Sequence, residues 1–496
     1  MTESRQAPPA GTRIGAHQLR ELLGEWRTDG STYTALADSV CGLVRDGWLP
    51  VTSRLPAERD LADALAVSRT TVASAYRLLR AQGRLVSRRG VGTFVAPGRA
   101  GPPDPRPALA GDPAARPIDL MVAALPAPEP WLSRATADAA ARLVRHTGGH
   151  GAFPAGLPEL REAIAARYTA RGLPTDPAQI LVTNGATGAL TLLLRQFGAA
   201  GDRMAVEAPT HPGVLRSLRQ AGVRPVPVRL CDSGWDLSAW RETLHAARPR
   251  LALLTPDFHV PTGLLMPPEQ RCALIALART AGVTLVVDET LTELWLDPAV
   301  QPPPAPSVHG RPDGPDTVIA VGSADKSYWG GLRIGWIRAG APTVRRLAEQ
   351  RLGLDVSCPV IDQLVLARLL GDAGEPAAVL DFQRERARRG RDTLVTLLRR
   401  ELPAWSFREP AGGLALWVRT GGVSARAVAE AAERHGVRLA AEPEFSAGAG
   451  AADDHVRLPY TQPPDVLAEA VRRLAEAVRA LPPGTRSGGR DAPTSF

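Results

Sequence analysis

The stretch Gly322-Ser323-Ala324-Asp325-Lys326-Ser327-Tyr328-Trp329-Gly330-Gly331-Leu332-Arg333-Ile334-Gly335 contains the only lysine of the 496-residue chain. The other 58 of the 59 basic side chains are arginine. Lysine is ordinarily among the commonest residues of soluble proteins, so this composition is unusual. A GC-rich coding bias explains the excess of arginine, but it does not explain the one lysine that remains. Lysine, unlike arginine, can lose its proton and attack a carbonyl carbon to form a Schiff base. The alternative is a chance surface lysine. The residues around Lys326 decide between these two interpretations.

Those neighbours form a recognisable pattern. Ser323 lies three residues before Lys326, and Arg333-x-Gly335 begins seven residues after it. The pattern resembles the S-x-x-K…R-x-G motif of fold-type I pyridoxal-phosphate (PLP) enzymes, the aminotransferase superfamily. The resemblance implies that Lys326 forms the internal aldimine with PLP and that Ser323 and Arg333 hold the cofactor phosphate. A hydroxyl and a guanidinium suit a dianionic phosphate.

Further motifs of the same superfamily follow in the expected order. Gly156–Arg161 matches G-x-x-x-L-R, and Thr255–Gly263 is similar to T-P-x-x-x-x-P-T-G. Leu181–Gly188 reads as a strand that runs into a helix, and a helix N-terminus is an anion site. The resemblance implies that Asp288, after the apolar run ending at Val287, pairs with the pyridine nitrogen. Its other reading is a simple helix cap. The residues expected at the phosphate end are Gly185, Ala186 and Thr187.

The substrate end of the expected site rests on one arginine. His455-Val456-Arg457-Leu458-Pro459-Tyr460 resembles the segment whose arginine binds the substrate carboxylate, which implies that role for Arg457. An ordinary surface arginine on a strand is the competing interpretation, because arginine is so common in this chain.

Several positions depart from the family pattern. His211 stands where relatives have a tyrosine that faces the PLP ring, and it is the residue expected to contact the ring here. Thr290 and Leu291 follow the acidic pair in place of a tyrosine, Val260 replaces an Asn or aromatic residue, and Gly151 replaces another tyrosine. Cofactor binding is therefore expected to be retained, and efficient transamination is not.

The N-terminal part has a different character. Tyr33–Val95 predicts three helices and a two-stranded hairpin, and it closely resembles the GntR-type winged helix-turn-helix DNA-binding domain through LPAERDLADALAVSRTTV and SRRGVGTFV. Ser68 is a natural N-cap for a helix over residues 69–80, which the resemblance places in the major groove. A helical scaffold with a solvated basic face is the alternative. The residues expected to read bases or to donate hydrogen bonds to phosphates are Ser68, Arg69, Thr70 and Thr71. Those expected to hold the DNA backbone are Arg59, Arg80, Arg88 and Arg89.

Composition divides the chain into four parts. Residues 30–97 are the expected DNA-binding domain, 98–117 a Pro/Gly-rich linker, 118–482 the aminotransferase-like domain, and 483–496 a disordered tail. Most of the first 30 residues are expected to be mobile, apart from a helical piece around His17–Trp26. Within 118–482, apolar strand-like runs alternate with amphipathic helices, which predicts an α/β fold with a mostly parallel sheet. A smaller C-terminal lobe is expected from about Pro376 to Leu481.

Charge and cysteine usage limit the cellular setting. The net charge of +8 is compatible with a nucleic-acid partner. The four cysteines lack metal or redox spacing, so no metal site is expected and the thiols should be reduced. No apolar run is long enough to span a bilayer, and the N-terminus lacks a signal-peptide core. Cytoplasm is therefore the expected location.

A GntR head on an aminotransferase-like body resembles the MocR subgroup of bacterial transcription regulators. The resemblance implies a homodimer that binds a double-stranded DNA operator and senses PLP or a PLP–amine aldimine. An active aminotransferase that carries a DNA-binding domain is one alternative. A regulator whose body serves only for dimerisation is the other.

Overall fold

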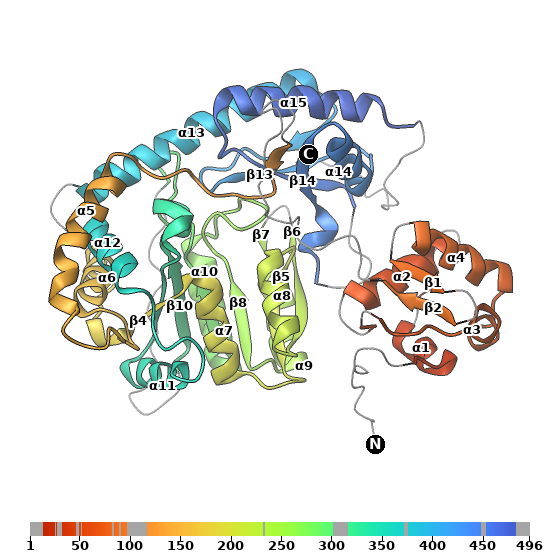
Figure 1. Cartoon of the computed structure of the whole chain (residues 1–496), viewed down its shortest axis with the longest axis horizontal. Coiled ribbons are helices and arrows are strands. Elements are labelled where there is room, and N and C mark those ends of the chain that lie inside the picture. Colours follow the sequence, from red (N-terminus) through yellow and green to blue (C-terminus); the bar gives the residue numbers. More distant parts are fainter. Residues whose placement is uncertain are drawn as a thin grey trace. The chain divides into compact units, whose positions relative to one another are not determined.

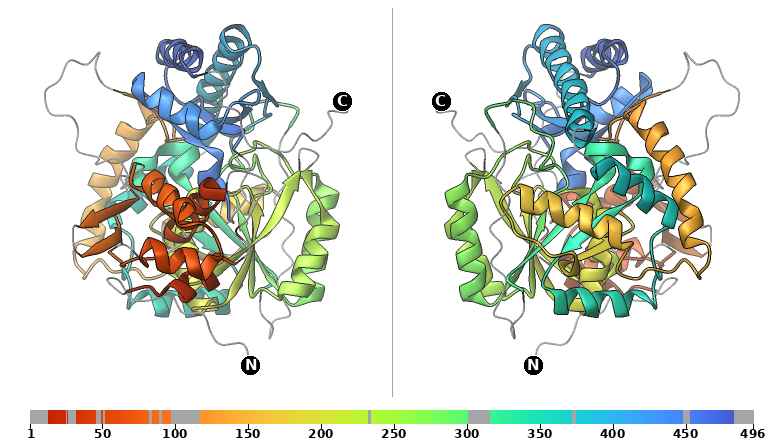
Figure 2. Two further views of the ribbon diagram at one scale, coloured as in Figure 1. Left: turned by 90° about the vertical axis from the view of Figure 1, so that its right-hand side faces the viewer. Right: turned by 90° about the vertical axis from the view of Figure 1, so that its left-hand side faces the viewer.

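The computed structural model describes residues 13–24, 26, 32–45, 49–50, 52–81, 84–88, 91–96, 117–231, 234–300, 316–371, 375–447 and 453–482. The chain divides into two compact units, residues 1–113 and 114–496 (Figure 1, Figure 2). The expected tail lies outside the described residues, as does the expected linker apart from Pro117. Within the described parts, every helix is too short or too polar to cross a lipid bilayer.

The first unit has the predicted winged helix-turn-helix fold. Its elements are α2 (Thr32–Arg45), α3 (Glu58–Leu65), α4 (Arg69–Ala81), β1 (Leu85–Arg88) and β2 (Gly92–Val95). Leu36 and Val40 recur at helical spacing in α2 and are buried together with Leu61, Val72 and Leu79. The two strands are antiparallel, with Leu85 opposite Val95 and Arg88 opposite Gly92.

An additional helix, α1 (Ala16–Leu23), precedes this fold. It corresponds to the helical piece expected around His17–Trp26. Leu19 and Leu23 face the core, and Ile14 and Trp26 are buried on either side of the helix. Burying side chains of this size favours the packed state by about 1.5–3 kcal/mol each, which explains why the segment packs against the domain.

The second unit is built on an eight-stranded sheet in the order β4-β11-β10-β9-β8-β5-β6-β7. These strands are β4 (Ile180–Thr183), β5 (Arg203–Ala208), β6 (Arg224–Cys231), β7 (Gly234–Trp235), β8 (Leu251–Leu254), β9 (Thr284–Asp288), β10 (Val318–Ser323) and β11 (Gly335–Arg338). Strands β10, β9, β8, β5 and β6 are mutually parallel, whereas β11 is antiparallel to β10 and β4. The mostly parallel sheet is confirmed, and the apolar runs assigned to it are its strands.

Helices cover both faces of this sheet, as Figures 1 and 2 show. They are α5 (Trp131–Leu143), α6 (Pro158–Ala170), α7 (Gly185–Phe197), α8 (Pro212–Gln220), α9 (Leu237–Ala247), α10 (Pro268–Ala281), α11 (Ala341–Arg351) and α12 (Val360–Leu370). Alternate strand residues enter different cores: Leu181 and Val286 pack with α7, α8 and α11, whereas Leu285 and Val287 pack with α9 and α10. Burial of both faces explains why the strands are continuous apolar runs.

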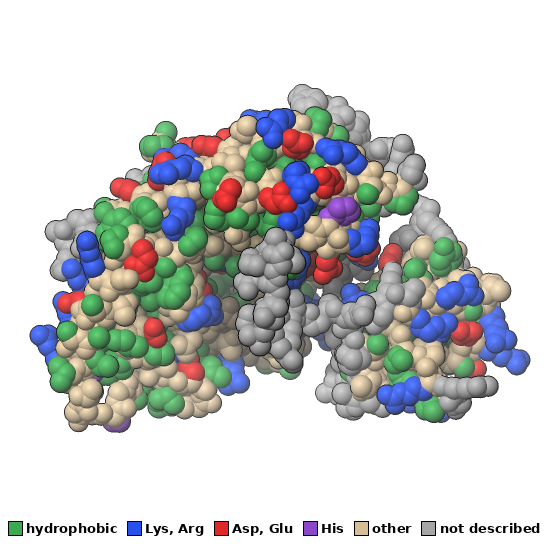
Figure 3. All heavy atoms as spheres, turned by 45° about the horizontal axis from the view of Figure 1, so that its top comes forward, with side chains coloured by type: hydrophobic (Ala, Val, Ile, Leu, Met, Phe, Trp, Pro, Cys, Tyr) green, Lys and Arg blue, Asp and Glu red, His purple; other side chains and the backbone are tan. Residues whose placement is uncertain are grey.

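A smaller lobe carries the sheet β12-β13-β15-β14-β3. Its elements are β3 (Ile118–Leu120), α13 (Glu375–Glu401), β12 (Ser406–Phe407), β13 (Ala415–Arg419), α14 (Ala425–Arg434), β14 (Val437–Ala441), β15 (His455–Pro459) and α15 (Pro464–Arg479). The lobe lies near the predicted range, but β3 joins it from the start of the unit by parallel pairing with β14. Figure 3 shows mixed acidic and basic side chains over this part of the surface, and ion pairs such as Arg472–Glu469 (2.7 Å) hold the exposed side of α15.

Candidate functional site

A cavity of about 260 Å³ lies at the carboxyl ends of the parallel strands. Ligands of open α/β sheets bind at this edge. The walls come from segments that follow β4, β5, β8, β9 and β10. Of the residues predicted for the cofactor and effector, those lining the cavity are Ala186, Thr187, His211, Asp288, Ser323, Lys326, Arg333 and Arg457. Gly185 lies beside it at the first position of α7.

Lys326 lies in a single π-helical turn, η4 (Asp325–Trp329), directly after β10. Its Nζ donates a hydrogen bond to the carbonyl oxygen of Ala123 at 2.8 Å. Burial lowers the pKa of the ammonium group and outweighs the opposing effect of Asp325; the Arg457 charge lowers the pKa further. A lysine with a lowered pKa supplies more of the neutral amine, the form that attacks a carbonyl carbon.

The start of α7 and the loop after η4 meet at one end of the cavity. Gly185 has φ +69°, and a Cβ on Gly335 would lie 2.5 Å from the Gly185 carbonyl carbon. The two backbones therefore approach as only glycine allows. Ser323 Oγ accepts a hydrogen bond from the Asp325 backbone N–H at 3.1 Å. Arg333 Nη1 lies 3.1 Å from Asp325 Oδ2. Hydroxyl, guanidinium and helix N-terminus together suit a phosphate.

Asp288 ends β9 and lines the cavity. Its Oδ1 accepts a hydrogen bond from the Thr290 backbone N–H at 2.9 Å. Burial raises the pKa of its carboxyl group, and the nearby Glu207 carboxylate adds to the rise. Burial disfavours the carboxylate form, and a cation placed against the carboxylate restores it. A protonated ring nitrogen in the cavity would therefore be stabilised by Asp288, as the sequence motif implied.

Glu207 and His259 form a buried polar pair that the sequence analysis did not single out, and His259 lines the cavity. Glu207 accepts hydrogen bonds from Trp235 Nε1 (2.5 Å) and the Thr255 backbone N–H (2.9 Å). His259 Nε2 is 3.4 Å from Glu207 Oε2, within ion-pair range. The orientation is too poor for a hydrogen bond, so this buried nitrogen has no hydrogen-bond partner among the described residues. His259 was part of a quoted motif, but no spacing rule assigned it a role.

His211 caps α8 and faces the cavity. Its Nδ1 accepts a hydrogen bond from the Gly213 backbone N–H at 3.0 Å. The surrounding protein and the positive charges of Lys326 and Arg457 lower the pKa of the imidazole. The ring is open to the cavity, so water moderates this effect, but the direction agrees with the hydrogen bond because Nδ1 must be unprotonated to accept. His211 therefore presents a neutral ring to the cavity.

Arg457 lies on β15 and is only 5% exposed, which rules out the surface-arginine interpretation. Its Nη2 donates to the Met121 carbonyl oxygen, and its guanidinium lies over the Phe445 ring at 5.3 Å. Burial lowers the pKa of the guanidinium to about 10. Its Nε is buried without a hydrogen-bond partner in the described structure. A carboxylate in the cavity would pair with the charge of this guanidinium.

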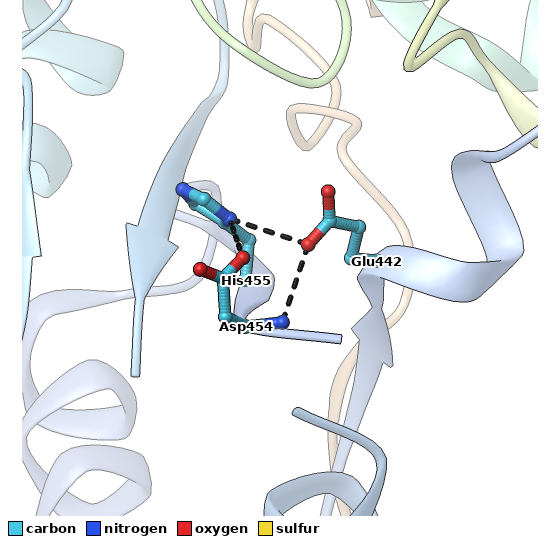
Figure 4. Close-up of side chains that lie close together, drawn as sticks. All are labelled: Glu442, Asp454 and His455. Atoms are coloured by element: carbon cyan, nitrogen blue, oxygen red, sulfur yellow. Dashed lines mark hydrogen bonds and ion pairs between the residues drawn. The ribbon is translucent and has the colours of Figure 1, made fainter. Parts of the chain in front are cut away.

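Beside Arg457, the other end of β15 is fixed by a cluster of three ionisable side chains, shown in Figure 4. His455 Nδ1 lies 2.7 Å from Asp454 Oδ1 and 3.2 Å from Glu442 Oε2. The ring stacks on Trp417 with centroids 5.1 Å apart. The two carboxylates raise the pKa of His455 to about 9 despite the burial that opposes it. The cluster is therefore an ion-paired imidazolium, with its Nδ1–H between two carboxylates.

The positions that depart from the family pattern form an apolar side of the cavity. Val260, Leu291 and Thr290 line it, next to Leu190, Leu253 and Phe258. None of the first three has the phenol or amide group that relatives place there. The groups that anchor a cofactor are present, whereas this wall offers few hydrogen bonds to its ring.

The expected DNA-binding residues lie on the first unit. Ser68 Oγ accepts a hydrogen bond from the Thr71 backbone N–H at 3.1 Å, as an N-cap does, and also contacts the Thr70 and Thr71 hydroxyls. Arg69 and Arg59 are exposed at the starts of α4 and α3. Arg80 donates to Ser87 at 3.2 Å, and Arg88 lies over Phe94 at 5.2 Å. Arg89 lies outside the described residues.

A winged helix-turn-helix joined to an aminotransferase fold defines a class of two-part proteins, and comparisons with known proteins agree with it. The family model "Aminotransferase class I and II" matches residues 125–474, and "Bacterial regulatory proteins, gntR family" matches residues 32–95. The chain is 30% identical over 364 residues to the 2-aminoadipate transaminase of Thermus thermophilus, covering 72% of this chain and 89% of the relative. It is 30% identical over 400 residues to the pyridoxine biosynthesis transcriptional regulator PdxR of Corynebacterium glutamicum, covering 77% and 82%.

A solved structure is similar as well. The α-aminoadipate aminotransferase LysN from Thermus thermophilus, complexed with N-(5'-phosphopyridoxyl)-L-leucine, aligns with a TM-score of 0.62 at 27% identity, covering 73% of this chain and 92% of that chain. This chain belongs to the aminotransferase class I and II family and, through its gntR-family domain, to the MocR-type regulators that combine the two. The cofactor of this family is PLP, and the cavity fits it: an amine of lowered pKa, a carboxylate, an anion-binding helix N-terminus and a buried guanidinium line one space.

Proposed function

We propose that this protein is a DNA-binding transcription regulator whose aminotransferase-like unit senses PLP, alone or joined to an amino compound. The observation that carries the proposal is the contrast inside the cavity. The anchoring groups Lys326, Asp288 and Arg333 are present, whereas Thr290, Leu291 and Val260 offer little to orient a ring. A missing transition-state hydrogen bond costs a rate factor of about 10² or more, whereas binding through a covalent bond and a phosphate survives such losses.

Each residue has a distinct proposed task. PLP, when bound, supplies an electrophilic carbon and an electron sink. Lys326 presents its amine to that carbon, and Asp288 holds a proton on the ring nitrogen. Ser323, Arg333 and the first residues of α7 (Gly185, Ala186, Thr187) bind the phosphate. His211 covers the ring, and Arg457 binds the carboxylate of an amino-acid effector.

DNA recognition is proposed for the first unit. Arg69 reads a guanine edge from the start of α4, because its fork can donate two hydrogen bonds to one base. Thr70, Thr71 and Ser68 supply short donors. Arg59, Arg80, Arg88 and Arg89 clamp the phosphates. A cytoplasmic location follows from a DNA partner.

We also propose a homodimer. Val122 and Trp329 are 57% and 37% exposed on the segments that carry Ala123 and Lys326. Leu352 and Val356 are exposed after α11, at 56% and 43%. Large apolar side chains exposed beside a binding site are typical of a surface that a second copy covers. Analytical ultracentrifugation of the full chain tests this, since a monomer at micromolar concentration contradicts it.

The deciding experiment compares turnover with DNA affinity. For PLP to regulate, it must bind two conformations of the protein unequally. We expect slow or undetectable transamination with amino donors, together with a PLP-dependent change in operator affinity that Lys326→Ala abolishes without abolishing DNA binding. Rapid turnover with unchanged DNA affinity would instead establish the enzyme alternative. No effect of PLP on either would leave the body a dimerisation scaffold.

A further inference from the structure

The place expected for the cofactor phosphate contains a carboxylate. Asp325 precedes the lysine and lines the same cavity. Its Oδ2 lies 3.1 Å from Arg333 Nη1. A Cβ built on Gly185, at the start of α7, would lie 3.4 Å from both this oxygen and Arg333 Nη2. The carboxylate therefore lies beside the guanidinium and the helix N-terminus that suit an anion.

The surroundings of Asp325 also disfavour its charged form. Its Oδ1 is buried and has no hydrogen-bond partner in the described part of the chain. Burial raises the pKa of the carboxyl group, although the charges of Arg333 and Lys326 act against the rise. A buried carboxylate oxygen without a hydrogen-bond donor is unfavourable, so Asp325 lowers the stability of the folded protein.

A phosphate dianion in this place meets a like charge. Two unit charges of one sign about 4 Å apart repel appreciably even at the dielectric of a protein surface. Arg333 must also exchange its existing ion pair for the phosphate. Both effects weaken binding of the phosphate, and neither acts on a ligand that lacks the phosphate.

We propose that Asp325 competes with the PLP phosphate for Arg333 and the N-terminus of α7, and so lowers the affinity of this protein for its cofactor. The inference rests on the proposed PLP-sensing function. A sensor must release its ligand when the ligand becomes scarce, so weaker binding of PLP suits a sensor, whereas an enzyme works best with a permanently bound cofactor. Asp325 is thus an affinity-determining residue of the phosphate subsite.

The test uses the cofactor-free, full-length protein. PLP and pyridoxal, which has the same ring and aldehyde without the phosphate, are titrated separately by absorbance and by quenching of tryptophan fluorescence. Asp325→Asn keeps the size and a hydrogen bond to Arg333 while it removes the charge. Asp325→Ser is a second variant, in case the amide disturbs folding. Asp465→Asn, an exposed carboxylate in the first turn of α15, is the charge-matched control.

We expect Asp325→Asn and Asp325→Ser to lower the Kd for PLP roughly tenfold or more and to lower the Kd for pyridoxal by a clearly smaller factor. The control variant should change neither Kd. An unchanged or weaker PLP affinity in both variants overturns the proposal, because Asp325 then positions Arg333 rather than competing for it. An equal gain for pyridoxal overturns it too, since the effect would then be on the lysine. Absence of PLP binding by the unchanged protein and all variants refutes PLP sensing itself.

A second inference comes from the first unit, where three arginines share one face of the wing sheet. Arg54 forms isolated bridges to Arg13 on one side and to Phe94 of β2 on the other. Paired residues point to the same face, so Arg13, Arg54 and Arg88, which lies over Phe94, are on one side. The opposite side is apolar and buried, formed by Ile14, Leu55, Leu85 and Val95.

This arrangement concentrates positive charge. Arg13 and Arg54 are direct partners, and like charges in that position repel. A Cβ on Gly92 would lie 2.7 Å from Arg54 Nε, so the glycine makes room for the Arg54 side chain across the wing. None of the three arginines forms an ion pair with an acidic side chain in the described part of the chain. Figure 3 shows basic side chains on this unit.

We infer that this face binds DNA phosphates and that Arg13, which precedes the residues matched by the gntR family model, extends the contact beyond the helix-turn-helix. A phosphate relieves the repulsion between Arg13 and Arg54, and each contact displaces counterions. The inference rests on DNA binding by the first unit.

Salt dependence tests it without knowledge of the operator. Binding of the full chain to a random-sequence DNA duplex is measured by fluorescence anisotropy over a range of KCl concentrations. Arg13→Gln and Arg54→Gln should each reduce the slope of log K against log salt by roughly 0.9. Arg195→Gln, an exposed arginine in α7 of the other unit, is the matched control. Unchanged slopes for both variants, with Arg88→Gln reducing the slope, overturn the inference. No duplex binding by the unchanged protein refutes DNA binding altogether.

Discussion

The ion-paired His455 at the start of β15 makes the stability of the second unit fall as the pH rises above neutral. His455 is held between Asp454 and Glu442, and Arg419 in turn binds Asp454 at 2.9 Å. In the unfolded chain the imidazole titrates near its ordinary pKa of 6.5, whereas in the folded protein its pKa is about 9. A group whose folded pKa is raised contributes its full stability below the unfolded pKa. That contribution is lost as the pH rises through the folded pKa, here between 6.5 and about 9.

The size of the effect follows from these two values. A tenfold change in proton affinity corresponds to about 1.4 kcal/mol. The rise from 6.5 to about 9 therefore corresponds to about 3–4 kcal/mol, as an upper limit, because His455 shares the gain with its carboxylate partners. The pKa of Asp454 is lowered, first by its hydrogen bond with His455, so its own contribution is lost only in acid.

Replacing His455 by glutamine removes the charge but keeps a hydrogen-bonding side chain of similar length. Urea unfolding of the full chain, followed by the fluorescence of tryptophans that lie mostly in residues 114–496, measures the stability of that unit. Below pH 6.5 we expect His455→Gln to cost about 2–3 kcal/mol, and above pH 9 we expect the difference to shrink to a fraction of this. An equal cost at both pH values would refute the reasoning, because the side chain would then act by packing on Trp417 alone.

Three further predictions concern the cofactor and DNA. Lys326→Arg should keep a positive charge yet lose borohydride-stable attachment of PLP, which in the unchanged protein should label the single peptide that contains Lys326; a label elsewhere contradicts the assignment. Arg69→Ala should relax base preference at a cost of about 1–3 kcal/mol, whereas Arg88→Ala should weaken specific and random DNA alike; equal weakening of all sequences by Arg69→Ala would reverse these roles. Gly335→Ala places a Cβ 2.5 Å from the Gly185 carbonyl carbon and should cost about 1–3 kcal/mol and weaken PLP binding. Gly188→Ala, whose Cβ would meet neighbours no closer than 3.5 Å, should lower neither the melting temperature nor the affinity.

Features that depend on local sequence could be predicted. The runs that became β4, β8 and β9 have only apolar residues between their first and last positions, because both faces of the sheet are covered, and such runs are visible without a structure. Ser68 was identifiable as an N-cap because a hydroxyl before a helical pattern has few other uses. The resemblance to the PLP superfamily supplied the candidate cofactor and effector residues, and all of them except Gly185 line one cavity.

Features that depend on tertiary contacts could not be predicted from the sequence. β3 has three residues and pairs with β14, more than 300 positions along the chain, so no local pattern marks it. The carbonyls of Ala123 and Met121 bind Lys326 and Arg457 through backbone atoms, which every residue type possesses. Asp325 stood inside the quoted motif, but only its position beside Arg333 and Gly185 reveals a conflict with phosphate.

Those two carbonyls connect the cavity to the path of the chain. Met121 and Ala123 lie directly after β3, only a few residues beyond the segment that leads from the winged domain. Lys326 and Arg457 hold this short stretch in place by donating hydrogen bonds to it, and Thr461 binds the Val122 carbonyl at 3.4 Å between them. A molecule that accepts those hydrogen bonds itself releases the stretch. Because β3 itself is held by its pairing with β14, such a molecule would free only the stretch of chain that follows β3.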